Sequence, residues 1–532
     1  MSEKKEKLQH NMGGEASVHE EKALPELQRR LKSRHLQMIA IGGTIGTGLF
    51  IGSGGAIAKS GPAGALIAYI FIGSIVYSVM MSLGEMATYI PVSGSFTVYA
   101  SRFVDPSLGF AMGWLYWFSW AVTFALELTA TGLIIKYWND ELSIAIFISI
   151  FWVLITGLNL LPVSFYGEIE FWFSSIKVMT VIGFLIFAIC INAGAGQQGY
   201  LGFTYWKDPG AFAGHKIEPK DSSLSIFVGF WAVLIQAGFS YQGTELVGIA
   251  AGETENPRKN VPAAIKKTFY RILFFFVFTV FFLGLLIPYD NKNLLNDTQD
   301  ASSSPFVIAV QLAGVKTLPG IINAVLLSVV LSAANSNVYS GSRILVGLSQ
   351  EGAAPKWMAL TTAKGVPYIA VLATSVVGFL AFLNLGKSSG EVFNWLLNIS
   401  SVAGFISWTV ILICHVRFMR CLKSRGIDRN TLPYKANWQP YYSYFGIFFN
   451  VLIILTQGFE SFMPFKVEEF FVSYVSLMLF VVLFVGHKLM FRTRMWRKEE
   501  VDIKTGCIEL DDTVWEEHTP TTTVGKFMSW LC

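Results

Sequence analysis

From Leu36 to Met490 the sequence alternates between long apolar runs and short polar links. Twelve runs contain about 20 residues or more, which is enough for a helix to cross roughly 30 Å of hydrocarbon. They are too long and too uniformly apolar for the strands of a membrane β-barrel. The pattern therefore predicts an all-α membrane protein with twelve transmembrane helices, over 36–58, 65–88, 108–138, 143–163, 171–194, 224–251, 269–288, 318–343, 368–386, 391–415, 442–462 and 468–490.

The composition agrees with a chain whose solvent is largely lipid. Charged residues make up 14% of the 532 residues, whereas a soluble domain carries about 25%. The 40 Lys and Arg are nearly balanced by 36 Asp and Glu, so no concentrated basic surface for a nucleic acid is expected. There is no HExxH, GxSxG or P-loop motif and no cysteine spacing typical of a metal site. These observations argue against an enzyme, a metal site and a bound cofactor.

Basic residues in the links indicate which helix ends face the cytoplasm. Short cytoplasmic links are enriched in Lys and Arg. The link between runs six and seven, the link between runs ten and eleven, and the residues after run twelve are enriched in this way, whereas the links after runs seven and nine hold one lysine each. Both tails, 1–35 and 491–532, are therefore expected in the cytoplasm. The sequon that begins at Asn296 would then lie outside, which makes this residue a candidate for glycosylation.

Two of the runs contain glycines where a continuous helix would not need them. Run one contains the segment Gly42–Gly48, with the sequence GGTIGTG, and run six contains Gly238–Glu245, with the sequence GFSYQGTE. Close helix packing through small residues is one explanation. The other is that both helices are interrupted. Run six follows run one by five spans, and glycine-interrupted segments at corresponding positions of two halves are typical of transporter binding sites.

Interrupting a helix inside the membrane leaves peptide groups without helical partners. N–H groups at the start of the second half suit a carboxylate, and C=O groups at the end of the first half suit an ammonium group. Such a site recognises the charged head of an α-amino acid. We expect N–H groups near Thr47 and Gly48 to bind its carboxylate. The full set of candidate ligands is Thr44, Gly46, Thr47 and Gly48 in run one and Phe239, Ser240, Tyr241 and Gln242 in run six, with Phe239 and Tyr241 as candidate lids or simply as packing residues.

Ionisable residues inside the apolar runs need a reason, because each costs about 2.5–3.5 kcal/mol at the centre of a membrane helix. Glu127, Glu245, Lys177 and Glu85 are such residues. Each could form a structural ion pair or bond to loose backbone, and this explanation is favoured for Glu85. Alternatively, apolar surroundings allow a carboxyl group to take up and release a proton during transport. Glu127 and Glu245 are the candidates for that role.

Several stretches resemble one family closely. They are IGGTIGTGLFIGSG from Ile41, YWFSWAVTFALELT from Tyr116, YGEIEFWFSSIK ending at Lys177, FSYQGTELVGIAAGETENPRKNVPAAIKK from Phe239 and SAANSNVYSGSRILVGLS from Ser332. The chain resembles the fungal basic (arginine/lysine) permeases of the yeast amino acid transporter family, within the amino acid–polyamine–cation superfamily. This resemblance implies a LeuT-like fold with two inverted five-helix repeats, 36–194 and 224–415, and two further helices in 442–490. It also implies proton-coupled uptake of arginine and lysine at the plasma membrane.

The resemblance also assigns roles to individual residues. It places Lys177 opposite the break in run one, where sodium-coupled relatives hold a cation, so that its ammonium group would replace Na⁺. It places Ser119, Thr123 and Ser400 near the end of the pocket that receives the side chain. Small hydroxyl residues leave room for a long cationic side chain, although a Ser or Thr inside a helix often bonds to its own preceding turn.

Alternatives remain within the same fold. A cationic amino acid accumulates in response to the membrane potential without any proton, so a facilitated uniporter or exchanger is one. A permease of broader specificity and a nutrient sensor are others. Lysines in the N-terminal tail are candidate ubiquitin acceptors, which would make ubiquitin-ligase adaptors partners of the cytoplasmic tails; they are Lys4, Lys5, Lys7 and Lys22.

Overall fold

The structure is a computed structural model of the chain. It describes residues 42–92, 94–139, 141–249, 251, 254, 256–294, 304–386 and 389–503, without the side chains of 163–169, 171 and 389. The N-terminal tail with its lysines, the sequon at Asn296 and the residues from 504 onward therefore lie outside the described residues.

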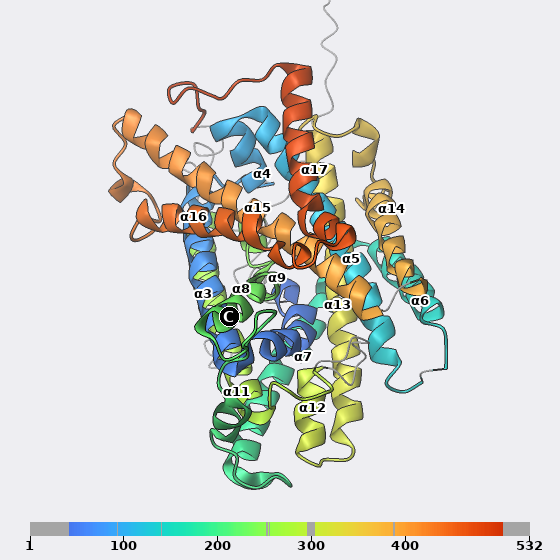
Figure 1. Cartoon of the computed structure of the whole chain (residues 1–532). Helices are drawn as coiled ribbons and strands as arrows, with labels where there is room; N and C mark the ends of the chain where they lie inside the picture. Colours follow the sequence, from blue (N-terminus) through green and yellow to red (C-terminus); the bar gives the residue numbers. More distant parts are fainter. Residues whose placement is uncertain are drawn as a thin grey trace, which may run out of the picture.

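The described chain folds into a bundle of helices (Figure 1). Within the described residues, ten helical segments are long and apolar enough to cross a membrane. The prediction of an all-helical membrane protein is thus confirmed. The main helices are α3 (Ser53–Tyr89), α5 (Pro106–Ile135), α6 (Ile144–Asn159), α7 (Val163–Cys190), α8 (Ser223–Ala232), α9 (Leu234–Tyr241), α10 (Leu246–Ile249), α11 (Pro257–Leu286), α12 (Pro305–Leu312), α13 (Leu318–Gln350), α14 (Tyr368–Val377), α15 (Ser389–Ser424), α16 (Tyr441–Thr456) and α17 (Val467–Phe491).

The number ten differs from the twelve predicted runs for two reasons. The first two runs fall within one segment, Gly48–Tyr89, because two helices meet directly at a kink at Gly61, where the backbone is not helical, with no loop between them. Gly61 has φ +75°, a conformation that glycine adopts readily and other residues avoid. The fourth run forms the shorter helix α6, of 16 residues.

Some helices extend beyond the predicted apolar runs. α11 begins at Pro257 instead of residue 269, and α15 ends at Ser424 instead of residue 415. The extra turns carry basic residues, among them Lys266 and Lys423. The apolar runs are therefore shorter than the helices that contain them.

The longest helices hold the bundle together. α13 packs along α5, α11 packs along α3, and α15 crosses α5 and then contacts both α16 and α17 (Figure 1). α5 and α15 are the most deeply buried of the long apolar segments, with 83% of the residues in each apolar window buried. These two helices therefore form the interior against which the interrupted segments pack.

The residues after α17 do not form a free tail at once. Trp496 donates its backbone N–H to the carbonyl of Val104 (3.0 Å) and its indole N–H to the carbonyl of Ser101 (2.8 Å). Arg417, near the end of α15, donates to the carbonyl of Trp496 (2.5 Å). Ile503 is fully buried. Residues 492–503 therefore form a strap that joins the last helix to the segment between α3 and α5.

Glu85 joins three elements in a buried ionic cluster. It is fully buried and accepts two bonds from the Arg429 guanidinium, at 2.8 and 2.7 Å. The backbone N–H of Ala436 donates to it at 2.9 Å, and the Nε2 of His415 lies 3.3 Å away. The structural ion pair favoured for this residue is confirmed, and it fixes the link between α15 and α16 to the end of α3.

We expect Glu85→Gln to destabilise the fold, because it leaves the Arg429 guanidinium without a counter-charge. Removing one partner of a buried ion pair costs about 3–5 kcal/mol. The matched control is Glu469→Gln, which removes the exposed Lys466–Glu469 pair (2.7 Å) and should cost less than about 1 kcal/mol. Unfolding temperatures of the purified variants in one detergent measure the difference. Equal temperatures for the two variants would contradict this role of Glu85.

Candidate functional site

The first interruption lies where run one was predicted to break. Gly42–Thr44 form a helical turn, the chain bends at Ile45 and Gly46, and a helix resumes at Thr47 and continues as the π-helical turn η1 (Gly48–Gly52). The Gly46 carbonyl accepts the N–H groups of Leu49 and Phe50, both at 3.2 Å. The bend therefore creates a new helix N-terminus, whose first N–H groups have no carbonyl partner in the preceding turn and carry partial positive charge.

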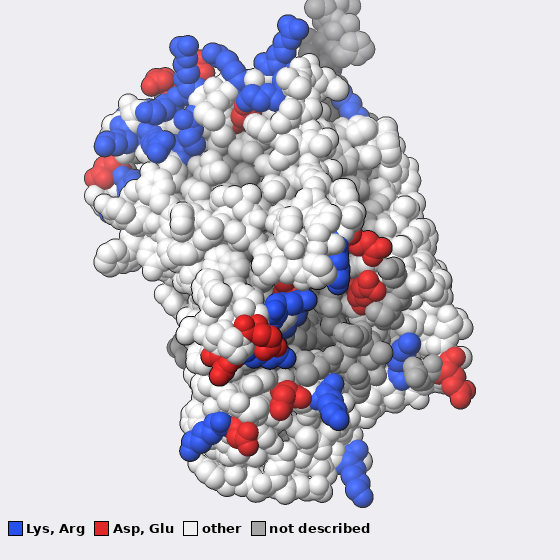
Figure 2. All heavy atoms as spheres, in the orientation of Figure 1, with Lys and Arg blue, Asp and Glu red and all other residues white. Residues whose placement is uncertain are grey.

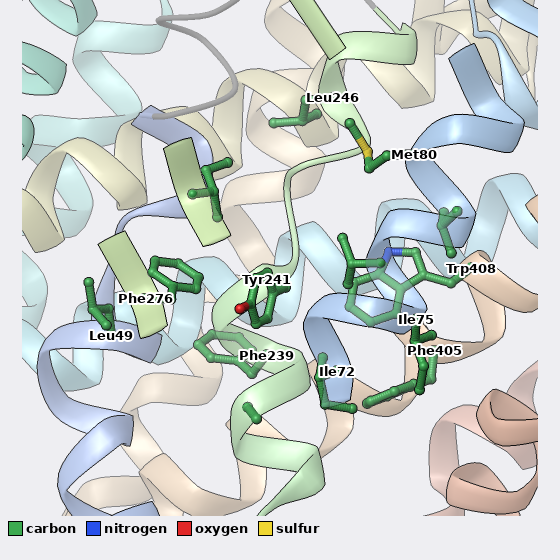
Figure 3. Packing of buried hydrophobic residues seen from close by; sticks show 14 of the residues in the cluster. Leu49, Ile72, Ile75, Met80, Phe239, Tyr241, Leu246, Phe276, Phe405 and Trp408 are labelled. Atoms are coloured by element: carbon green, nitrogen blue, oxygen red, sulfur yellow. The ribbon is translucent and has the colours of Figure 1, made fainter. Parts of the chain in front are cut away.

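The second interruption lies between α9 and α10. α9 ends at Tyr241, Gln242 is extended, and Gly243 has φ +93° before the helix resumes at Leu246. Figure 3 shows this connection as a thin segment that runs from Tyr241 to Leu246, with Trp408 of α15 beside it. Run six is thus discontinuous, as predicted.

The two interruptions touch each other. A Cβ atom on Gly243 would lie 2.8 Å from the carbonyl oxygen of Gly43. A Cβ atom on Gly48 would lie 2.7 Å from the Cα of Ser240, which is backbone and cannot swing aside. Both explanations for the glycines therefore hold. The helices are interrupted at these residues, and they also pack more closely there than any side chain would allow.

A cavity opens where the two interruptions meet. It is lined from both interrupted segments and from α5, α13 and α15. Predicted residues that line it are Thr44, Gly46, Thr47, Gly48, Ser119, Thr123, Glu127, Phe239, Gln242 and Glu245. Residues that the sequence reasoning missed are Gly43, Tyr116, Trp120, Ala333, Asn337 and Gly404.

Glu127 lines this cavity, and one of its oxygens has no hydrogen-bond partner. Its Oε1 accepts a hydrogen bond from the hydroxyl of Thr47 at 2.9 Å. Its Oε2 is buried and has no hydrogen-bond partner in the structure, although the side chain is only 2% exposed. A buried acceptor without a partner is costly, so Oε2 is suited to a proton or to a donor supplied by a ligand.

Glu245 has a different environment. Its carboxylate accepts bonds from the hydroxyl of Tyr116 (3.1 Å), the indole N–H of Trp408 (3.3 Å) and the backbone N–H of Gly243 (3.3 Å). These donors come from α5, α15 and the interruption itself. Glu245 therefore holds the unwound segment against its neighbours.

Lys177 lies behind the first interruption, outside the cavity lining. It is fully buried, and its ammonium group donates to the carbonyl of Gly42 at 2.5 Å. Its counter-charge is Glu170, whose Oε1 lies 4.0 Å away and which also accepts bonds from Ser174 and Ser332. The sequence reasoning missed Glu170. Its separation of seven residues from Lys177, which places both on one face of a helix, was the available signal.

The hydroxyl residues predicted for the side-chain end of the pocket lie together. The hydroxyl oxygens of Thr123 and Ser400 are 2.5 Å apart, and those of Ser119 and Ser400 are 3.3 Å apart. Thr123 also bonds to the carbonyl of Ser119 one turn earlier (2.8 Å). Gln242 donates to the carbonyl of Ser401 (2.9 Å). Ser119 and Thr123 line the cavity, and Ser400 lies directly behind them.

Besides Ser400, two predicted ligands lie away from the cavity lining, Ser240 and Tyr241. The hydroxyl of Tyr241 donates to the carbonyl of Tyr69 in α3 (3.1 Å), and the hydroxyl of Ser240 lies 3.0 Å from the Tyr69 hydroxyl. Tyr241 is fully buried and packs edge-on against Phe276 (Figure 3). The period of α9 turns these side chains toward α3, so Phe239 is the candidate lid that the geometry retains.

The chain belongs to the amino acid permease family, whose model matches residues 35–500. It is accordingly a multi-pass membrane transport protein and not an enzyme. It is 49% identical to the lysine-specific permease of Saccharomyces cerevisiae over 502 residues, which cover 94% of this chain and 82% of that protein. It is 50% identical to the basic amino-acid permease of the same yeast over 495 residues, which cover 92% and 86%. The solved structure of a nucleobase-cation-symport-1 family transporter in a closed conformation matches with a TM-score of 0.49 and 13% identity, over 90% of this chain and 97% of that one.

We expect Gly48→Ala to destabilise the protein and Gly46→Ala to leave it intact. The added methyl group at Gly48 would meet the Ser240 backbone, whereas at Gly46 it would lie an ordinary 3.7 Å from the Ala333 methyl group. Overpacking of this kind costs about 1–3 kcal/mol. Unfolding temperatures after extraction into one detergent measure the effect. A Gly48→Ala protein as stable as Gly46→Ala would show that the two segments do not pack in this way.

Proposed function

We propose that the protein is a secondary active transporter that imports cationic L-amino acids, arginine and lysine, together with protons, by alternating access across the plasma membrane. The observation that carries this proposal is the meeting of two interrupted helices at one cavity, where Glu127 presents an oxygen without a partner. The family membership supports transport of amino acids. The names of the two yeast relatives support a basic substrate.

The amino-acid head would bind between the two interruptions. N–H groups of the helix that begins at Thr47 would receive the carboxylate, with the positive end of the helix dipole behind them. Carbonyls at the end of α9 and at Thr44 would receive the amine. The Phe239 carbonyl already accepts the N–H of Gln242 at 3.1 Å, and its second lone pair remains for a ligand. The cationic side chain would extend toward Ser119 and Thr123.

The proposed architecture has twelve spans, of which the first ten form the LeuT-like inverted repeats 36–194 and 224–415, followed by two spans in 442–490. The two interruptions support this scheme because they fall in the first and sixth predicted runs. Basic residues at the helix ends support the proposed orientation of the chain in the membrane. Figure 2 shows Lys and Arg gathered at its upper left, over the end of α15 and the start of α16. Basic links remain in the cytoplasm, and both tails would lie on that side.

Lys177 supports coupling to protons instead of sodium. Its ammonium group occupies the carbonyl of Gly42 behind the interruption. A fixed cation there bonds to a carbonyl that would otherwise attract a metal ion. The same charge also repels a second cation. Glu127 is the preferred proton carrier because Glu245 already accepts hydrogen bonds from three donors.

A facilitated uniporter or exchanger is the second candidate. One charge is worth about 2.3 kcal/mol per 100 mV, so a cationic amino acid alone would accumulate roughly fiftyfold for each 100 mV. A broader amino-acid permease and a nutrient sensor of the same fold are further alternatives. Uptake of radiolabelled arginine, competed by a panel of amino acids at two pH values, separates these alternatives from the basic symporter: the panel tests specificity, the pH dependence tests proton coupling, and a sensor shows no uptake.

We expect Gly46→Leu to reach the cell surface but to transport no arginine. The first carbon of the leucine side chain has space, and the rest would project among Ala333, Glu127 and the cavity. Uptake of radiolabelled arginine per surface-labelled protein is the measurement, with Gly46→Ala as the control of smaller volume. Normal uptake by Gly46→Leu would refute a binding role for this cavity.

We expect Glu127→Gln to flatten the pH dependence of uptake. In a proton symporter, acid outside increases uptake by the parent protein, and an amide at this position cannot carry the proton. Glu245→Gln should instead lower the amount of folded protein, because Tyr116 and Trp408 donate to different oxygens of Glu245, and an amide would place an NH2 group against one of these donors. A Glu127→Gln protein that keeps the parent's pH profile would show that Glu127 does not carry the coupled proton.

We expect replacement of Na⁺ by choline to leave arginine uptake unchanged, since the ammonium group of Lys177 would take the place of a sodium ion at the Gly42 carbonyl. The measurement compares initial uptake rates in the two media at equal pH and ionic strength. A large loss of uptake in choline would overturn proton coupling as proposed.

A further inference from the structure

A second pocket lies away from the transport cavity, at the end of α15 that is expected in the cytoplasm. It is enclosed by the last turns of α15, the link to α16 and the first turns of α16. Its polar lining includes Arg420, Lys423, Asp428, Arg429, Lys435 and Tyr444. We refer to it as the basic pocket.

We propose that the basic pocket binds the phosphate-containing headgroup of an anionic phospholipid, with one acyl chain lying along α16. This inference concerns lipid recognition. It depends on the protein being embedded in a membrane and not on the identity of the transported substrate.

Among the residues that the structure describes, carboxylates do not neutralise the charge of the pocket. Arg429 is committed to Glu85 by two hydrogen bonds. Arg420, Lys423 and Lys435 remain, and within the described residues no carboxylate lies within 4.0 Å of their charged nitrogens. Asp428 is the one carboxylate of the lining, and it is exposed. Three cations against one carboxylate leave room for an anionic group.

Two of these cations are held in place by neutral partners. The guanidinium of Arg420 donates to the hydroxyl of Tyr444 at 3.3 Å. The ammonium group of Lys435 donates to the side-chain oxygen of Asn430 at 2.7 Å. These partners orient the cations without cancelling their charge, and both side chains retain further N–H groups for phosphate oxygens.

An apolar stripe begins at the rim of this pocket. Five exposed side chains recur along α16 at spacings of three and four residues, so they share one face of the helix. They are Tyr441, Tyr444, Phe448, Val451 and Leu455, exposed by 75, 45, 61, 38 and 58%. Tyr444 belongs to both the stripe and the pocket. A soluble phosphate would not use this stripe, whereas an acyl chain attached to the headgroup would lie along it.

The position in the fold agrees with an interfacial lipid. Trp438, in the link before α16, is 74% exposed, and aromatic residues of this kind settle at the headgroup level of a bilayer. Figure 2 shows basic side chains gathered over this end of the molecule. Anionic lipids enrich the cytoplasmic leaflet, where Lys and Arg near the surface attract them.

The test measures stabilisation by lipid. The full-length protein in a neutral detergent is titrated with phosphatidylserine and, separately, with phosphatidylcholine, and its unfolding temperature is recorded. The variant carries Arg420→Gln, Lys423→Gln and Lys435→Gln. A matched control carries Lys356→Gln, Arg494→Gln and Lys498→Gln, which removes three exposed cations outside the pocket. Stabilisation by arginine is measured in the same samples, so that loss of lipid binding is distinguished from failure of the transport site or of folding.

Phosphatidylserine should raise the unfolding temperature of the parent and of the control more than phosphatidylcholine does. The pocket variant should require roughly a hundredfold more phosphatidylserine for the same stabilisation, while arginine still stabilises it. Equal responses of parent and pocket variant would overturn the proposal. Equal stabilisation by phosphatidylcholine would show that charge is not recognised. Equal stabilisation by soluble glycerophosphoserine would assign the pocket to a soluble phosphate and also overturn it.

Discussion

The close contact between the two interrupted helices is the constraint on which the rest of the site depends. Gly43 meets Gly243, and Gly48 meets Ser240, at distances that leave no space for a Cβ atom. Because the segments meet there, the new helix N-terminus at Thr47 and the C-terminal end of α9 face the same small volume. Backbone N–H and C=O groups that would bond to each other in a continuous helix become available to a ligand.

Buried charges maintain this arrangement from three sides. Lys177 takes up the carbonyl of Gly42 and is balanced by Glu170, while Glu245 binds the second interruption to α5 and α15. Both of these acids have donors around them. Of the three acids, Glu127 alone has an oxygen without a partner, and it lines the cavity. Glutamate therefore stabilises the interrupted backbone at Glu170 and Glu245, whereas Glu127 is available to bind a proton or a ligand.

Much of this organisation could be predicted from the sequence, because apolar runs report spans and glycine clusters report broken helices. Features that depend on how the helices pack against one another could not be predicted. Hydropathy cannot show that the first two predicted helices meet at a kink at Gly61 without a loop, nor that the basic turn around Lys266 is helical. Glycine spacing located the interruptions, but the direction in which Tyr241 points depends on the rotation of α9. Asn337 and Trp120 reach the cavity through packing of distant helices, which no local pattern reveals.

An experimental structure of the full-length protein with bound arginine tests the central claim most directly. The account predicts the α-carboxylate about 3 Å from the backbone N–H of Thr47 or Gly48, with the amine at the end of α9 and the guanidinium directed toward Ser119 and Thr123. Arginine bound elsewhere, or bound here with its charged head touching neither interruption, would contradict the account.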